Sequence, residues 1–258
     1  MYLLDLTLST AAANLALDEA LVEEAEETGS SAEVLRLWEP EKPLVVLGRS
    51  SRPELEVDLD WCAGQGIPVL RRTSGGASIV TGPGCLMYSV VLSIERRPEL
   101  KSIDQAHCFV LKRLIEALSG IAPVAARCGT SDLAIDTSGA FSNAADEETL
   151  RGAAKKFSGN SLRAKRRHLL YHGTLLFDFD LELVSRCLKH PPREPGYRAG
   201  RTHAEFIANL PATREQLRAA LVKEWRATEV LSEWPRERTE ALVGEKYARE
   251  GWNLRGQS

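Results

Sequence analysis

A short apolar run, Pro68-Val69-Leu70, stops at Arg71-Arg72-Thr73-Ser74-Gly75-Gly76, and strand character resumes at Ala77-Ser78-Ile79-Val80. Glycine adopts backbone angles that other residues avoid, so Ser-Gly-Gly between two strands predicts a tight turn. The glycines also leave backbone N–H groups uncovered, and such groups can approach an anion closely. The segment therefore predicts a phosphate or carboxylate cradle at a strand end, with an ordinary turn as the alternative.

The chain has 258 residues and a hydrophobic fraction of 43%, enough for a substantial core. Its net charge of −3 gives no reason to expect nucleic acid or an anionic membrane as a partner. The first residues lack the basic region and cleavage site of a signal peptide, and no stretch approaches the roughly 18 apolar residues of a membrane span. We therefore expect a cytoplasmic protein that binds neither nucleic acid nor membrane.

The cysteines are odd in number and widely spaced, without a CxxC pair that would indicate zinc or a disulfide framework. We expect buried free thiols and no metal site. The five are Cys62, Cys85, Cys108, Cys128 and Cys187.

Alternating apolar residues predict strands, and 3.6-residue periodicity predicts helices. The run 87–92 is apolar on both faces, as in a central strand, so the cradle should lie at the edge of a hairpin inside the sheet. In the helix that follows Ser9 or Thr10, Glu19 falls on the expected solvated side. The expected strands are 2–8, 34–38, 44–48, 67–70, 87–92 and 128–135, and the expected helices follow Thr10 and Val57 and span 104–118, 180–188, 214–225 and 237–247.

No internal repeat or linker interrupts the chain, which predicts one domain with a helical C-terminal segment. Residues 136–154 are poor in large apolar groups and are predicted to form an exposed insertion. The basic stretch 163–168 could face an acidic carrier domain or form a solvated hairpin. It lacks the interleaved aromatic residues that are typical of nucleic-acid binding.

Two blocks resemble the lipoate–protein ligase and octanoyltransferase superfamily. Residues 71–77 resemble its Arg-Arg-x-Ser-Gly-Gly-Gly signature, with Ala77 in place of the third glycine. Residues 155–159 and 171–176 are similar to its Lys-x-(Ser/Ala)-Gly segment and its His-Gly-(Thr/Ser)-Leu-Leu strand, in the same order. Weaker matches lie at 14–21 and 246–253.

The resemblance implies an α/β (α+β) fold with a class II synthetase-like mixed sheet flanked by helices, as in biotin and lipoate ligases. It implies a catalytic domain over residues 1–212, with the helical segment 213–258 packed on the same domain and no C-terminal accessory domain. The Gly-Arg-Gly-Arg adenylate loop of biotin ligases is absent, which favours lipoate or octanoate chemistry.

The resemblance also implies site residues. Lys156 is the catalytic candidate, because the matching lysine lies against the acyl carbonyl and the adenylate phosphate, whereas Lys155 is expected to be dispensable. Adjacent strand residues point to opposite sides, so one of Arg71 and Arg72 should face the ligand, with Arg72 favoured. The expected acyl-nucleotide site comprises Arg49, Arg71, Arg72, Ser74, Gly75, Gly76, Ala77, Asp132, Ser158, Gly159, His172 and Gly173.

Two of these residues have competing interpretations. His172 is either a base that helps to deprotonate an incoming lysine or a strand histidine that hydrogen-bonds the loop; the structural role is favoured because an amine attacking a mixed anhydride needs little base assistance. Asp132 lies either near the acyl pocket or at an ordinary strand edge.

The function that the resemblance favours is a lipoate–protein ligase, which would use lipoate, ATP and Mg²⁺ to make lipoyl-AMP and pass the lipoyl group to a lysine. Its partners would be lipoyl domains of 2-oxoacid dehydrogenases or the glycine cleavage H protein, with a separate accessory subunit as a further expectation. One alternative is an octanoyltransferase that takes octanoate from acyl carrier protein through a cysteine thioester, for which Cys128 is the candidate nucleophile. A module that binds an acyl-nucleotide or a partner without turnover is the third possibility.

Overall fold

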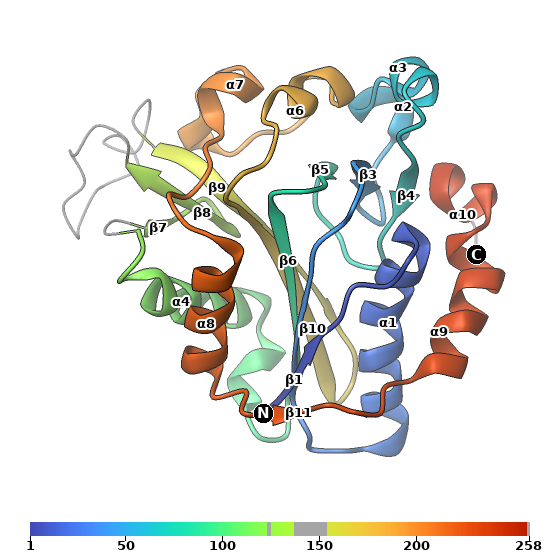
Figure 1. The fold of residues 1–258 in the computed structure, drawn as a ribbon, viewed down its shortest axis with the longest axis vertical. Helices are drawn as coiled ribbons and strands as arrows, with labels where there is room; N and C mark the ends of the chain where they lie inside the picture. The colour runs from blue at the N-terminus through green and yellow to red at the C-terminus, as the bar shows by residue number, and fades with distance from the viewer. Residues whose placement is uncertain (123–124, 137–153, 257–258) are drawn as a thin grey trace.

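The computed structural model describes residues 1–122, 125–136 and 154–256, and within them the framework is an eight-stranded mixed sheet (Figure 1). The strand order is β11-β1-β2-β6-β10-β9-β8-β7. β1 runs parallel to β2 and β11, and the other neighbours are antiparallel. The strands are β1 Tyr2–Asp5, β2 Val34–Trp38, β6 Cys85–Ser93, β7 Ala125–Cys128, β8 Asp132–Asp136, β9 Ala154–Ala164, β10 His168–Leu176 and β11 Glu229–Val230.

Helices cover both faces of this sheet, which confirms the predicted fold class (Figure 1). α4 and α8 pack with Tyr88 and Tyr171 on one face, whereas α1 packs with Leu170 and Val91 on the other. β6 and β10 are buried along their whole length, so the central strand predicted at 87–92 is confirmed. The helices are α1 Ala11–Thr28, α2 Pro53–Glu56, α3 Leu59–Gly64, α4 Ile103–Leu118, α6 Glu182–Cys187, α7 His203–Phe206, α8 Arg214–Trp225, α9 Arg236–Leu242 and α10 Glu250–Arg255, with 3₁₀ turns η1 Pro98–Lys101 and η2 Gly196–Arg198 and a π-helical turn η3 Val243–Tyr247.

A second, three-stranded sheet carries the cradle segment in the order β4-β3-β5. Its strands are β3 Leu44–Leu47, β4 Val69–Arg71 and β5 Ile79–Thr81. β3 is parallel to β4 and antiparallel to β5, so the predicted hairpin at the cradle is wrong. β3 is buried throughout and takes the central place. The cradle therefore connects the two outer strands of this sheet.

α1 begins where the sequence predicts, since the Thr10 side chain accepts a hydrogen bond from the backbone N–H of Ala13 at 3.1 Å. Its acidic side is not fully solvated, because the C-terminal segment packs against it. Glu19 is only 3% exposed, and its carboxylate pairs with Lys246 at 2.7 Å. The expectation of a solvated Glu19 is therefore wrong.

The segment after residue 212 packs on the same framework. α8 lies against α4, and α9 and η3 lie against α1 (Figure 1). The segment also supplies β11, which pairs with β1 at the sheet edge and was not predicted. The helix predicted over 237–247 is divided between α9 and η3.

Two further expectations concern the region around residue 130. The strand predicted over 128–135 is confirmed from Asp132 onward as β8, whereas residues 129–131 form the turn after β7, where Gly129 adopts a positive φ of 56°. The insertion predicted at 136–154 lies, apart from its two end residues, outside the described residues.

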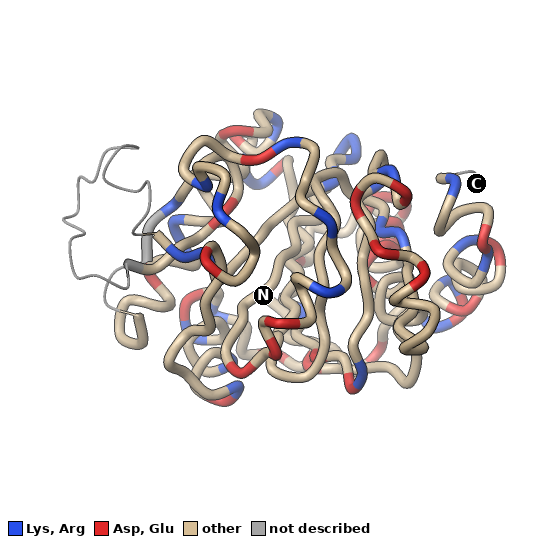
Figure 2. Tube along the Cα trace, turned by 90° about the horizontal axis from the view of Figure 1, so that it is seen from above, with Lys and Arg blue, Asp and Glu red and all other residues tan. Residues whose placement is uncertain are grey.

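Positive and negative residues are both spread over the whole trace in the view of Figure 2, in keeping with the small net charge. No helix in the described part of the chain has the length and apolarity needed to cross a membrane.

Candidate active site

Arg71 ends β4, and its guanidinium is engaged by backbone carbonyls. Its Nη1 donates to the carbonyl oxygens of Gly48 at 2.8 Å and Ser51 at 2.9 Å, and its Nε donates to that of Trp252 at 3.0 Å. The residue is 2% exposed. Arg71 thus ties the loop after β3 to the C-terminal helix, away from the cavities described below.

Arg72 lies on the opposite side and lines the larger of two cavities. Its guanidinium donates to the carbonyl oxygens of Val46 at 3.2 Å and Ala77 at 3.0 Å, and to the Ser74 hydroxyl at 3.1 Å. Burial lowers its pKa to about 10, so the group is still a cation at neutral pH. Of the two arginines, Arg72 is the one at the cavity; its contact with an anion stays a prediction.

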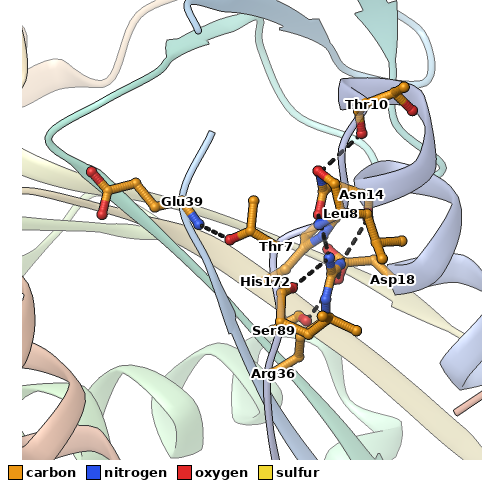
Figure 3. Close-up of polar contacts among 10 residues, drawn as sticks. Thr7, Leu8, Thr10, Asn14, Asp18, Arg36, Glu39, Ser89 and His172 are labelled. Atoms are coloured by element: carbon orange, nitrogen blue, oxygen red, sulfur yellow. Dashed lines mark hydrogen bonds and ion pairs between the residues drawn. The ribbon is translucent and has the colours of Figure 1, made fainter. Parts of the chain in front are cut away.

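His172 connects the cradle to a buried ion pair. Its Nδ1 lies 3.3 Å from an Asp18 carboxylate oxygen, and Asp18 accepts from Arg36 at 2.6 Å (Figure 3). Its Nε2 lies 2.6 Å from the Ser74 hydroxyl. In the neutral tautomer that donates from Nδ1 to this carboxylate, Nε2 is the acceptor for the Ser74 hydroxyl. Both ring nitrogens are thus used within the protein, in keeping with the favoured structural role of His172.

The cradle depends on a close approach of two backbone segments. Gly76 has a positive φ of 87°, and a Cβ on Gly48 would lie 1.8 Å from the Gly76 carbonyl oxygen. Side chains are therefore excluded at both positions. Ala77 lines both cavities, Gly75 is exposed, and the exposed Arg49 side chain lines neither cavity.

Lys156, on β9, holds its ammonium 2.8 Å from an Asp132 carboxylate oxygen on β8. The other Asp132 oxygen accepts from the Tyr197 hydroxyl at 2.8 Å. A Cβ on Gly159 would lie 2.9 Å from Lys156 Nζ, so the glycine makes room for the ammonium. The structure thus brings together Lys156, Asp132 and Gly159, all of which the sequence predicts to be in the site.

A β-bulge interrupts β9 at this point. The register with β8 shifts between Leu133 and Ala134, which pair with Ser158 and Lys156. Lys156, the fully buried Phe157 and Ser158 are consecutive, and all three line the smaller cavity. Bulges of this kind redirect side chains next to functional sites.

Gly173, on β10, is required by packing, because a Cβ there would lie 2.0 Å from Asn160 Oδ1. Asn160 donates to the Ser131 carbonyl oxygen at 2.7 Å, beside Asp132. Gly173 and Asn160 both line the larger cavity.

Two cavities of about 150 and 380 Å³ share Lys156, Asp132 and Gly159 in their walls. The larger one has an apolar wall formed by Leu15, Val46, Ile79 and Met87. The smaller one combines an apolar wall with basic side chains, namely Lys189, Arg193, Arg198 and His203. This arrangement suits a ligand with an apolar part and an anionic part that meet at Lys156.

All five cysteines lie in the described residues, and none lines either cavity. Cys128 is 1% exposed. Burial, with a contribution from the nearby Asp132 carboxylate, raises the pKa of its thiol to about 12. Such a thiol is neither ionised nor accessible at neutral pH, which is unfavourable for a nucleophile.

The basic stretch 163–168 lies against α1. Lys165 pairs with Glu23 at 3.2 Å, His168 Nδ1 lies 3.3 Å from a Glu26 carboxylate oxygen, and the backbone N–H of Arg167 donates to that carboxylate. The stretch thus forms the turn of the β9–β10 hairpin, as one of the two alternatives expected, and acidic residues of α1 contact much of it.

Three residues of the site were missed by sequence reasoning. Asp18 lies three residues from both Leu15 and Leu21. A carboxylate on the apolar face of a predicted helix could have indicated a buried polar site. Asn160 follows the recognised Ser-Gly pair directly. Tyr197 lies in a proline-rich loop without periodicity, which gave no signal.

Curated relatives cover most of the chain. An octanoyltransferase LipM of Carboxydothermus hydrogenoformans is 28% identical over 262 residues, with 95% of this chain and 94% of the relative covered. A putative lipoate-protein ligase A of Aeropyrum pernix is 25% identical over 221 residues, with 85% and 72% covered.

Solved structures share the fold. A bi-partite lipoate protein ligase of Thermoplasma acidophilum, studied with its E2 lipoyl domain, superposes with a TM-score of 0.76 at 24% identity and 98% and 95% coverage. A putative ligase of the same organism with bound lipoic acid gives 0.73 at 22% identity, and a lipoate-protein ligase A bound with ATP gives 0.75 at 23%, each with 98% of both chains covered.

A family model described as the lipoyl protein ligase A/B catalytic domain matches residues 10–228, which is most of the chain. Its relatives carry the names of lipoate-protein ligases and octanoyltransferases, so the chain is an enzyme of one of these two kinds. The resemblance read from the cradle, the Lys156 segment and the His172 strand is thereby confirmed: this chain belongs to the lipoyl protein ligase A/B catalytic domain family.

Proposed function

We propose that this protein is a lipoate–protein ligase-like acyltransferase that forms or uses lipoyl-AMP and transfers the lipoyl group to a lysine of a lipoyl domain. The observation that carries the proposal is the position of Lys156. Its ammonium lies in the shared wall of two cavities that both combine apolar and basic side chains, and no cysteine lines either. A mechanism based on a lysine cation is therefore favoured over one based on a thiol.

In the proposed complex the acyl chain occupies the larger cavity, against Leu15, Val46 and Met87. The adenylate occupies the smaller cavity, whose basic side chains suit a phosphate. The backbone N–H groups of the cradle and the Arg72 guanidinium then lie beside the carboxyl end of the acyl chain. Lipoate and ATP are bound by two proteins of the same fold, which supports both compounds as ligands of this site.

Lys156 provides the electrostatic part of the chemistry. An ammonium has three N–H donors, and with one on Asp132 the other two can serve the acyl carbonyl and phosphate oxygens. The acceptor lysine, as the neutral amine, attacks the acyl carbon; the bond from that carbon to the phosphate oxygen breaks, AMP leaves with the electron pair, and the amine loses a proton. A fixed cation beside the developing oxyanion lowers the barrier of this step.

A Mg²⁺ ion is part of the proposal only together with ATP. In the described residues no group of three or more His, Cys, Asp or Glu side chains could hold a metal by itself. Magnesium in nucleotide sites commonly relies on one or two carboxylates and on the phosphates themselves. Asp132 is the carboxylate nearest to Lys156 that could contribute.

The second candidate is octanoyl transfer from acyl carrier protein. It is favoured by the similarity to an octanoyltransferase LipM over 94% of that relative's length. The buried Cys128 is its weak point, because the thiol would have to become both exposed and ionised.

We test the two candidates by intact-mass analysis of an apo lipoyl domain. The domain is incubated with the protein and either lipoate plus ATP-Mg²⁺ or octanoyl-acyl carrier protein, and the assay is repeated for Lys156→Ala, Lys155→Ala and Cys128→Ala. The ligase predicts a lipoyl mass gain that requires ATP, falls at least ~10²-fold in Lys156→Ala and survives in the other two variants.

An octanoyl gain without ATP that disappears in Cys128→Ala would instead establish the cysteine route. No gain in either incubation would contradict a self-sufficient enzyme and point to a separate accessory subunit, or to binding without turnover. The bi-partite ligase of the same fold makes the accessory subunit the next component to add. A lipoyl domain of a 2-oxoacid dehydrogenase and the glycine cleavage H protein are the two acceptors to compare, and a cytoplasmic location is part of the same proposal.

A further inference from the structure

Tyr197 lies in η2, in the loop between α6 and α7, and is fully buried. Its hydroxyl donates to one carboxylate oxygen of Asp132 at 2.8 Å, and the other oxygen lies 2.8 Å from Lys156 Nζ. Three side chains from separate segments thus form one chain of polar contacts that ends at the ammonium in the cavities.

The Tyr197 hydroxyl can act in this chain only as a donor. Burial, followed by the effect of the Asp132 carboxylate, raises the pKa of Tyr197 far above its ordinary value, so the phenol stays protonated. One carboxylate oxygen therefore accepts a hydrogen bond from the phenol, and the carboxylate is oriented with its second oxygen toward Lys156.

Tyr197 is itself held in place by a contact of its ring and by a hydrogen bond to its backbone. It packs against Phe206 of α7, with 5.1 Å between ring centroids. The Tyr197 carbonyl accepts from Arg201 at 2.8 Å, and Arg201 also donates to the carbonyl of Ala154 at 2.9 Å. Ala154 begins β9, the strand that carries Lys156, so the loop is bound to the strand it serves.

We propose that Tyr197 is a positioning residue for the acyl transfer: it holds Asp132 so that the Lys156 ammonium stays at the junction of the two cavities. This inference rests on the proposed function for its kinetic consequence. Neighbours of Tyr197 in the same loop, Pro195 and Arg198, line the cavities, so the loop that meets the ligand also sets the position of the lysine.

The first test compares Tyr197→Phe with Tyr171→Phe. Tyr171 is also fully buried, and its hydroxyl lies 2.9 Å from His107 Nδ1, on the face of the sheet covered by α4. Tyr197→Phe should lower kcat about tenfold and leave KM for the acceptor domain within about twofold, because loss of one hydrogen bond to a charged group has roughly this size. Tyr171→Phe should leave kcat unchanged. Equal kcat values for the two variants would overturn the proposal.

The second test asks whether Tyr197 acts through Asp132. In an Asp132→Asn background, Tyr197→Phe should cause no further loss of kcat, since residues that act through one another are not additive. A full tenfold loss in that background would show that Tyr197 acts by another route.

A third measurement does not depend on the proposed function. Amine labelling of the folded protein, followed by peptide mass spectrometry, gives the rates at Lys156 and Lys155 in the same molecule. Tyr197→Phe should raise labelling of Lys156 relative to Lys155 at least threefold, because the ammonium is no longer held against Asp132. An unchanged ratio would overturn the positioning role even if the enzyme proved to catalyse a different acyl transfer.

Discussion

At the scale of single residues, Gly159 shows how the absence of a side chain places a charge. Its missing Cβ leaves room for Lys156, whose Nζ and Cε would lie 2.9 and 3.0 Å from that atom. Both are at the far end of a flexible side chain. An added methyl group would therefore move the lysine and spare the backbone.

Gly159→Ala should consequently reduce activity at least tenfold while the melting temperature changes by less than about 2 °C. The ammonium is displaced from Asp132, but no core contact is lost. Lipoyl transfer by intact mass and thermal unfolding of the same sample check both parts.

Gly120→Ala is the matched control, because nothing lies within 4 Å of a Cβ at that position and its φ is not positive. It should match the wild type in both measurements. A Gly159→Ala protein with full activity would show that the position of Lys156 is not critical.

At the scale of elements, α10 closes the edge of β4. The Arg71 backbone N–H donates to Asn253 Oδ1 at 3.0 Å, and the Trp252 indole N–H donates to the Arg71 carbonyl at 2.9 Å. The guanidinium of Arg71 in turn donates to the carbonyl of Leu254 at 3.3 Å, near the C-terminal end of α10, where carbonyls lack partners within the helix. α10 thus holds the strand from which the cradle begins.

Asn253→Ala should lower the free energy of unfolding by about 1–3 kcal/mol, because a buried backbone N–H of Arg71 loses its acceptor. It should also raise KM for the acyl substrate several-fold, since the cradle follows Arg71 directly. Urea unfolding and the initial rates of the transfer assay give the two quantities.

Asn209→Ala provides the comparison. Asn209 also makes two backbone hydrogen bonds, at 3.2 and 3.0 Å to Phe179, but neither residue lines a cavity. This variant should have a lower free energy of unfolding than the wild type and an unchanged KM for the acyl substrate. The same KM in both variants would mean that α10 does not influence the cradle.

At the scale of the whole molecule, two adjacent carboxylates of α1 join separate parts of the chain. Burial alone would raise the pKa of Asp18, but Arg36 and His172 outweigh it and lower that pKa. Burial would likewise raise the pKa of Glu19, and Lys246 with Tyr247 lowers it. Asp18 thereby connects α1 to β2 and β10, and Glu19 connects α1 to the C-terminal segment.

These depressed pKa values set the direction of a pH effect. A carboxylate whose pKa is lower in the folded than in the unfolded state stabilises the fold fully above its unfolded pKa near 4 and loses that contribution as pH falls through its folded pKa. The urea midpoint should therefore be constant from about pH 7 to pH 5 and fall steeply below pH 4. A midpoint that rises on acidification would contradict these ion pairs.

Lys246→Met isolates the Glu19 part. It should cost about 3 kcal/mol at pH 7, because the nearly buried Glu19 loses its counter-charge, and the difference from wild type should shrink at low pH. Lys165→Met, which breaks the partly exposed pair with Glu23, should cost less than about 1 kcal/mol at any pH. Equal losses of unfolding free energy in the two variants would show that burial does not increase the cost of breaking the Glu19 pair.

The sequence by itself determined the features that depend on residues close together in the chain. The glycines of the cradle, the Lys156-to-Gly159 segment and the His172-Gly173 strand could be recognised because each needs particular residue types at fixed spacing. The spacing of apolar residues likewise predicted most strands and helices, including β6 and α8, because the periodicity of an element determines which of its residues share a face.

Only the tertiary structure decided which distant segments meet. β3 lies between β4 and β5, Glu19 is covered by the C-terminal segment, and Lys165 is paired with α1, although nothing near these residues in the chain indicates it. The contact of Tyr197 with Asp132 joins residues 65 positions apart. Such pairings depend on how whole elements pack, and the free energy that selects them comes from surfaces that no single segment contains.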